Sequence, residues 1–173
     1  MSQDNVKIYH SADSGQNPVV SDAERAAEEY RLQNENGNLK KAHQLGAEVT
    51  DCFLGMEVGR EFAPQEWVLL SYLAQNLLEQ GLENPILQKS AQARFNEELE
   101  KSSPELAQVI HDSKAFTLYS LNETRLRSRS EGEIFAELCE RPGDQKLIQM
   151  GEKLALEFTN KVETILRGIS FLQ

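Results

Sequence analysis

The chain has 173 residues and a formal net charge of -10, which results from 28 Asp and Glu against 18 Lys and Arg. This length is sufficient for one domain with a hydrophobic core. The composition, with 39% hydrophobic and 27% charged residues, is that of a globular protein and excludes a disordered chain. The acidic excess repels phosphate backbones, so nucleic acid is not expected as a partner.

Segments that would direct the chain to a membrane or out of the cell are missing from the sequence. No apolar run approaches the roughly 20 residues that span a bilayer. The first residues, MSQDNVKIYHSADS, lack the apolar core of a signal peptide. We therefore expect a cytoplasmic protein without membrane contact.

Motifs of familiar catalytic and cofactor sites are also missing. Cys52 and Cys139 lie far apart, outside any CxxC pair, and their apolar neighbours indicate core positions rather than nucleophiles. His10, His43 and His111 complete no ExxH or HExxH pattern. Neither a P-loop nor a GxSxG motif occurs. No cofactor is expected. The lack of these motifs favours a protein that is not an enzyme.

The first part of the chain divides into a polar tail and two helices. Residues 1–20 are polar and lack a helical period, which predicts a tail. Ser21 and Glu24 form a capping-box pattern that starts a helix near residue 22, and the NENGN stretch interrupts it. A stripe at spacings of 3 and 4 then predicts a helix over about 38–60. Its members are Ala42, Leu45, Val49, Cys52 and Met56.

Prolines mark the starts of the next three helices, because the first helical turn does not need the N–H that proline lacks. Pro64 opens the predicted central helix, which is apolar over more than half its circumference and ends at Gly81. Pro85, with Asn84 as N-cap, opens the second. Pro104 opens the third, predicted to run for roughly 20 residues or more.

A short helix around EIFAELCE and a long final helix complete the predicted elements. In the final helix, apolar residues keep a period near 3.6 from Leu147 to Leu172. No strand pattern occurs outside the tail. We therefore predict an all-α fold, a single-domain bundle of about six mostly antiparallel helices over 21–173, preceded by the polar N-terminal tail 1–20.

Three arginines at every second position follow the third of the proline-initiated helices. On a continuous helix Arg125 and Arg129 share a face while Arg127 points nearly opposite, so all three converge only on an extended chain. Ion pairs at i, i+4 or the helix dipole account for them without a ligand. The functional alternative is that Arg125, Arg127 and Arg129 bind an acidic partner or a phosphate.

Residues 133–155 have the order of a helix-turn-helix, with a short helix, a turn that contains glycine and a second helix. Gln145 and Lys146 at the start of the second helix suit base contacts, but Asp144 and Glu152 accompany them. A DNA-binding regulator is one alternative, and a plain helical hairpin explains the same pattern.

Two pairs of carboxylates have the spacing that places both members on one helical face. Glu48 and Asp51 form an ExxD pair, and Glu97 and Glu100 form an ExxE pair. All-α nucleotide pyrophosphatases pair such motifs around magnesium, although there the ExxE comes first. The alternative that follows is a metal-dependent all-α hydrolase of a phosphorylated substrate. Solvated helix faces explain the same residues.

The leading hypothesis is a non-enzymatic helical module for protein interaction or regulation. Several amphipathic helices and the lack of catalytic motifs favour it. The expected partner is another protein, a second copy of the chain included. Trp67, at the start of the predicted central helix, is a candidate contact residue, with core packing as the alternative.

Overall fold

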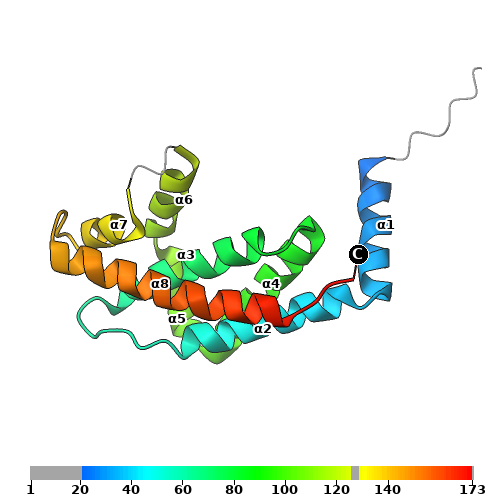
Figure 1. Cartoon of the computed structure of the whole chain (residues 1–173), viewed down its shortest axis with the longest axis horizontal. Coiled ribbons are helices and arrows are strands. Elements are labelled where there is room, and N and C mark those ends of the chain that lie inside the picture. The colour runs from blue at the N-terminus through cyan, green and yellow to red at the C-terminus, as the bar shows by residue number, and fades with distance from the viewer. Residues whose placement is uncertain (1–20, 126–128, 173) are drawn as a thin grey trace, which may run out of the picture.

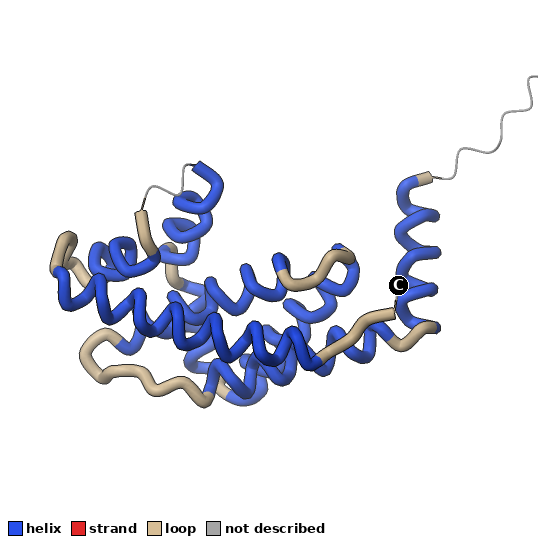
Figure 2. The backbone as a smooth tube through the Cα atoms, viewed as in Figure 1, coloured by secondary structure: helices blue, strands red, loops and turns tan. Residues whose placement is uncertain are grey.

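A computed structural model describes residues 21–125 and 129–172, and within these ranges the chain forms eight α-helices and no strand (Figures 1 and 2). The prediction of an all-α fold is confirmed, and the expected number of about six helices is wrong. The helices are α1 (Asp22–Glu35), α2 (Asn38–Leu54), α3 (Ala63–Gln80), α4 (Pro85–Ser102), α5 (Pro104–Asp112), α6 (Ala115–Arg125), α7 (Glu131–Leu138) and α8 (Gln145–Gly168). The tail 1–20 lies outside the described residues.

Three boundaries differ from the sequence-based expectation. The final helix, whose apolar period was expected to continue to Leu172, ends at Gly168, because Ile169 has an extended backbone with φ of -111° and ψ of 121°. The helix that opens at Pro104 stops at Asp112, because Ser113 has an extended backbone with ψ of 118°. The Ser113 hydroxyl accepts a hydrogen bond from the Ala115 N–H at 3.2 Å, which starts α6 as a separate helix. The helix predicted to reach residue 60 ends at Leu54, with Gly55 as its C-cap.

The predicted helix starts are confirmed by their caps. Ser21 and Glu24 make the reciprocal hydrogen bonds of a capping box at α1. Asn84 caps α4 through its side-chain oxygen, and a proline occupies the first turn of α3, α4 and α5. A further capping box, between Ser130 and Glu133, starts α7.

The core is built around α3, as the sequence predicts. Every residue from Val68 to Ala74 is buried, so α3 is enclosed on all sides over two turns. The ring of Phe53 on α2 lies 5.5 Å from that of Phe95 on α4 and 6.4 Å from that of Phe158 on α8. These edge-on aromatic contacts join three of the long helices in one core.

Gly132 of α7 and Gly151 of α8 allow these two helices to cross at backbone distance. A Cβ added to Gly151 would lie 3.0 Å from the Cα of Gly132 and 2.9 Å from the Cβ of Phe135. A Cβ added to Gly132 would meet the carbonyl oxygen of Ile148. The position of α7 is therefore set by backbone contact with α8.

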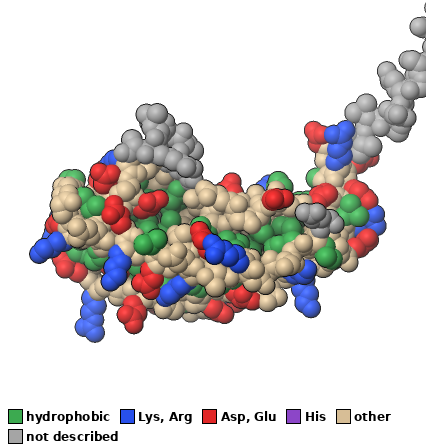
Figure 3. All heavy atoms as spheres, in the orientation of Figure 1, with side chains coloured by type: hydrophobic (Ala, Val, Ile, Leu, Met, Phe, Trp, Pro, Cys, Tyr) green, Lys and Arg blue, Asp and Glu red, His purple; other side chains and the backbone are tan. Residues whose placement is uncertain are grey.

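Helix α1 stands apart from the other helices. Figure 1 shows it projecting from one end of the elongated bundle, beside the end of the chain, while α7 lies at the opposite end. Figure 3 shows acidic and basic side chains spread over the visible face of the bundle. Within the described residues, no helix is long and apolar enough to cross a membrane.

Candidate functional site

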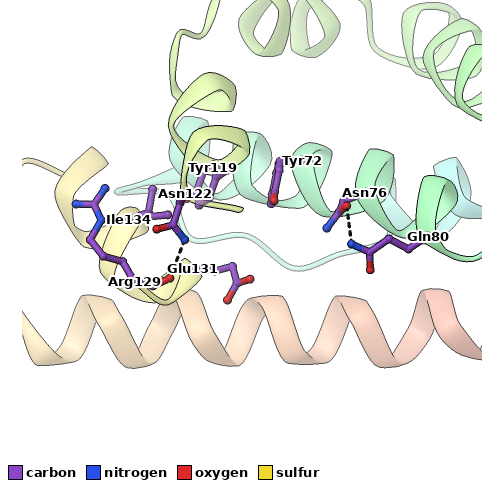
Figure 4. Close-up of a pocket in the computed structure, with 8 residues that line it drawn as sticks. All are labelled: Tyr72, Asn76, Gln80, Tyr119, Asn122, Arg129, Glu131 and Ile134. Carbon is purple, nitrogen blue, oxygen red and sulfur yellow. Dashed lines mark hydrogen bonds between the residues drawn. The ribbon is translucent and has the colours of Figure 1, made fainter. Parts of the chain in front are cut away.

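A polar pocket of about 350 Å³ lies between α3, α6 and α7 (Figure 4). One wall is a row of polar side chains spaced four residues apart along α3, and Figure 4 shows this row with Asn122 and Glu131 approaching from other elements. The lining residues are Tyr72, Asn76, Gln80, Tyr119, Asn122, Arg129, Glu131 and Ile134.

Tyr119 is the buried member of this pocket. Only 1% of its surface is exposed, and its ring stacks on that of Tyr72 with centroids 5.1 Å apart and planes inclined by 20°. Within the described part of the chain, the Tyr119 hydroxyl is the one buried side-chain polar atom without a hydrogen-bond partner. Buried hydroxyls are ordinarily bonded, so this group indicates a missing partner.

Burial raises the pKa of Tyr119 well above its usual range, and the nearby Cys139, Glu131 and Tyr72 raise the pKa further. The phenol is therefore protonated at any physiological pH. In that state its hydroxyl can both donate and accept a hydrogen bond.

The mouth of the pocket carries one charge of each sign. The Arg129 guanidinium forms an ion pair with Glu137, and its backbone carbonyl accepts a hydrogen bond of 2.8 Å from the Asn122 amide. Glu131, in the first turn of α7, places a carboxylate at the same opening. Because Arg129 already has an acidic partner, the mouth has no surplus of positive charge for an anion.

The structure describes the predicted arginine cluster in part. Arg125 is the last residue of α6, but its side chain is outside the described part, and Arg127 lies outside the described residues altogether. Arg129 is exposed and pairs with Glu137, while Glu133, four residues after Arg129, takes part in the capping box of α7. The binding of an acidic partner by all three arginines remains a prediction.

The second candidate region is α1, in which no residue is buried. Tyr30 is 56% exposed and Leu32 is 44% exposed, which is high for large apolar side chains in a folded domain. The helix is held to the bundle by polar contacts. Glu29 accepts a hydrogen bond of 2.6 Å from Asn84, and Gln33 accepts one of 2.6 Å from Asn38.

A groove of about 600 Å³ runs along the base of α1. It lies between the start of α2, the turn from α3 to α4 and the last described residues of the chain. The apolar residues of its lining are Leu82, Pro85, Leu87, Phe171 and Leu172. Leu172 is 58% exposed, so this end of the molecule has apolar surface beside the projecting helix.

Trp67 is packed against the core. Its ring centroid lies 4.9 Å from that of Phe53, and the side chain is half-buried. The geometry fits the packing alternative, and the role of Trp67 in binding a partner remains a prediction.

The segment 133–155 forms a hairpin of α7 and α8, joined by a turn in which Gly143 has a φ of 80°. It carries five acidic residues against three basic ones, so its charge opposes a DNA backbone. The acidic residues are Glu133, Glu137, Glu140, Asp144 and Glu152. The close crossing of the two helices accounts for the pattern without nucleic acid.

The four carboxylates of the hydrolase alternative do not form a metal site. Glu48 on α2 accepts a hydrogen bond of 2.7 Å from its neighbour Gln44, and Asp51 is exposed. Glu97 and Glu100 are exposed on α4. In residues 21–125 and 129–172, no three His, Cys, Asp or Glu side chains are grouped so that they could hold a metal ion.

The two cysteines have the properties of packing residues. Cys139 is buried and Cys52 is half-buried, and both are free thiols. Burial raises the pKa of Cys139 to about 11 and also raises that of Cys52. Neither is activated as a nucleophile, in agreement with the sequence-based expectation.

The polar pocket was not predicted from the sequence. A signal was present in Tyr72, Asn76 and Gln80, which recur at i, i+4 and i+8 along α3 and so form a polar stripe on a largely buried helix. The contribution of Tyr119 and Ile134 could not be inferred, because it depends on how α6 and α7 pack on α3.

Comparison of the chain with known protein families, with curated proteins and with solved structures gave no match. The polar pocket and the exposed helix α1 are therefore the two regions that bear on function.

Proposed function

We propose that this protein is a non-enzymatic helical interaction module that associates with a second copy of itself through α1. The observation that carries the proposal is that α1 buries none of its residues although it is a regular, capped helix. An isolated helix of about this length is marginal in water, since most helical stability in proteins comes from packing of one face. A partner that covers α1 would supply that packing.

Four apolar residues of α1 form a self-complementary stripe, and Leu32 lies on the opposite face. Ala23, Ala26, Ala27 and Tyr30 follow the spacing i, i+3, i+4, i+7 and therefore share one face. In an antiparallel pair of α1 helices centred between Ala26 and Ala27, Tyr30 of each copy lies opposite Ala23 of the other. The large ring then meets the smallest apolar side chain, and the alanines permit close approach of the two helices.

The charges beside this stripe fit the same arrangement. Glu24 and Arg31 lie on one flank of the stripe, and a two-fold axis brings the equivalent flanks of two antiparallel helices together. Arg31 of one copy then lies near Glu24 of the other. Within its own helix Arg31 already pairs with Glu28 and Glu35, so this contact adds little to the stability of the dimer. Two short helices bury less than the roughly 1,200 Å² of a standard stable interface, so the dimer is expected to depend on concentration.

The experiment is sedimentation equilibrium of the full chain and of the variant Ala27→Glu over a wide range of protein concentration. Glutamate preserves helix propensity, so the variant changes the stripe without breaking α1. Ala93→Glu is the matched control, because Ala93 is an exposed alanine within α4. We expect reversible dimers for the parent chain and for Ala93→Glu, and monomers for Ala27→Glu.

A parent chain that stays monomeric at all concentrations would overturn the proposal, as would equal dimerisation of both variants. We also propose a cytoplasmic location, which is inferred from sequence patterns alone.

A further inference from the structure

We infer that the apolar groove at the base of α1 is filled by residues 18–20 of a second copy of the chain, with Val20 as the residue that enters it. This inference rests on the proposed association through α1 and names what the partner copy contributes to that interface. The lining of the groove, the position of Val20 in the sequence and the register of the paired helices support it.

The groove is an apolar surface that the described part of the chain leaves open. Leu82 and Leu87 in its lining are 4% exposed each, whereas Leu172 is 58% exposed. Its volume of about 600 Å³ leaves room for several side chains. Apolar surface of this kind gains free energy when another apolar group covers it and displaces water. An apolar occupant is therefore favoured.

Residues 18–20 supply such an occupant. With the sequence Pro-Val-Val they are the longest apolar run of the tail, and they directly precede the N-cap Ser21. The residue before an N-cap often packs on an apolar side chain at the fourth position of the helix, but in α1 that position is Arg25. The sequence of α1 thus offers Val20 no apolar partner of this kind.

The Val20 of the same chain cannot reach the groove. Its Cα atom lies about 3.8 Å from that of Ser21, which stands at the start of α1. Gln33, the residue of α1 that lines the groove, lies roughly three turns further along, or about 18 Å at 1.5 Å per residue. Figure 1 shows that the first turn of α1 is the part farthest from the other helices. The Val20 that fills the groove therefore has to come from another copy.

The register of the proposed helix pair brings the Val20 of a second copy to the groove. In that pair Tyr30 of one copy lies opposite Ala23 of the other, and the same antiparallel register places Val20 of one copy opposite Gln33 of the other. Gln33 follows Tyr30 by three residues, so it lies on the same side of α1 as the stripe. The second chain consequently enters its own α1 beside the groove of the first.

The two-fold axis of the dimer makes this contact twice, once at each end of the pair of α1 helices. Each Val20 then leaves water for a groove that also contains Phe171 and Leu172. The added contacts enlarge an interface that two short helices alone leave below the standard size. The dimer should therefore be tighter than the α1 stripe alone would make it.

The first test is sedimentation equilibrium of the full chain with Val20→Asp. The dissociation constant of the dimer should rise about tenfold or more, because a charge replaces an apolar contact that occurs twice. Aspartate is favourable near a helix N-terminus, so α1 itself is not weakened. Val6→Asp is the matched control, since it makes the same change in the same tail away from α1, and it should stay within about twofold of the parent.

A second pair of variants tests the groove itself. Leu172→Asp keeps the backbone bonds to Asn38 and should also weaken the dimer. Leu156→Asp is its control, because Leu156 is a 64% exposed leucine on α8. When Leu172→Asp is combined with Val20→Asp, the loss of affinity should be smaller than the product of the two single losses, because both changes remove the same contact.

A cysteine pair shows directly which chain fills the groove. A disulfide needs Cα atoms within about 7 Å, and Leu172, like Gln33, lies at the base of α1, out of reach of the Val20 of its own chain. Mild oxidation of the variant with Val20→Cys and Leu172→Cys should therefore give a covalent dimer. The variant with Val20→Cys and Leu156→Cys should give none under the same conditions.

The results separate this inference from the proposed association. A parent chain that is monomeric at every concentration would overturn both. If the parent dimerises and Ala27→Glu does not, equal dimerisation of Val20→Asp and Val6→Asp overturns the inference alone. The lack of a covalent dimer from the pair at positions 20 and 172 does the same.

Discussion

The side chain of Asn38 makes two hydrogen bonds to the backbone of Leu172, 134 positions later in the chain. It accepts from the Leu172 N–H at 2.9 Å and donates to the Leu172 carbonyl at 2.7 Å. Asn38 is 1% exposed and Leu172 is 58% exposed, so these bonds are shielded from water on the Asn38 side. They fasten the segment that follows α8 to the start of α2.

Replacement of Asn38 by alanine should therefore destabilise the protein. The change leaves the N–H and carbonyl of Leu172 without their partner and also removes the bond to Gln33. We expect a loss of about 2 kcal/mol in the free energy of unfolding, measured by urea denaturation. Asn96→Ala, a change at an exposed asparagine of α4, is the control and should stay within about 0.5 kcal/mol of the parent. Equal effects of the two changes would contradict the role of Asn38.

Removal of the Tyr119 hydroxyl should stabilise the protein. In Tyr119→Phe an unpaired buried group disappears while the ring packing on Tyr72 is kept. The free energy of unfolding should rise by about 0.5–1 kcal/mol, against the usual direction for a substitution in the core. Thermal denaturation of the parent chain and of the variant measures this change. A clear fall in stability would mean that the hydroxyl has a partner in the folded chain.

A methyl group at the crossing of α7 and α8 should separate the two helices. In Gly151→Ala the new Cβ would lie 2.9 Å from the Cβ of Phe135 and 3.0 Å from the Cα of Gly132, so backbone has to move. We expect a loss of about 1–3 kcal/mol in the free energy of unfolding. Gly168→Ala is the control, because a Cβ there meets no atom within 4 Å and alanine favours a helix. The control should be neutral or slightly stabilising.

The thiol of Cys139 should make stability depend on pH in the alkaline range. Burial, and next the Glu66 carboxylate, raise the pKa of Cys139 to about 11, above the ordinary value of 9.0. The folded state therefore holds this proton more tightly than the unfolded state does. The resulting stability is fully present below pH 9 and is lost as the pH rises toward 11. Urea titrations of the parent and of Cys139→Ala across this range should show a steeper decline for the parent, and parallel curves would contradict the assignment.

Helix positions that depend on local chemistry could be predicted from the sequence, and contacts between distant segments could not. The prolines at 64, 85 and 104 and the capping residue Ser21 start helices as expected, because each acts within one turn. The break at Ser113 was not predicted, because no glycine or proline marks it in the sequence. The Ser113 hydroxyl caps α6 only because the chain turns there, and the turn itself is visible only in the structure.

The candidate sites follow the same division. The exposed stripe of α1 is readable as a helix pattern, but only the structure shows that α1 lacks a covering partner within the described chain. The polar stripe on α3 is likewise readable, whereas the burial of Tyr119 depends on α6. The acidic pairs that begin with Glu48 and Glu97 show the opposite case. Each pair has the spacing that places it on one helical face, but the two pairs do not come together in a metal site within the described residues.

The contact of Gly132 with Gly151 also bears on the motion of α7. With no side chain between these glycines, α7 has little room to slide along α8. Glu131 and Ile134, which α7 carries, should therefore change position only when the two helices separate.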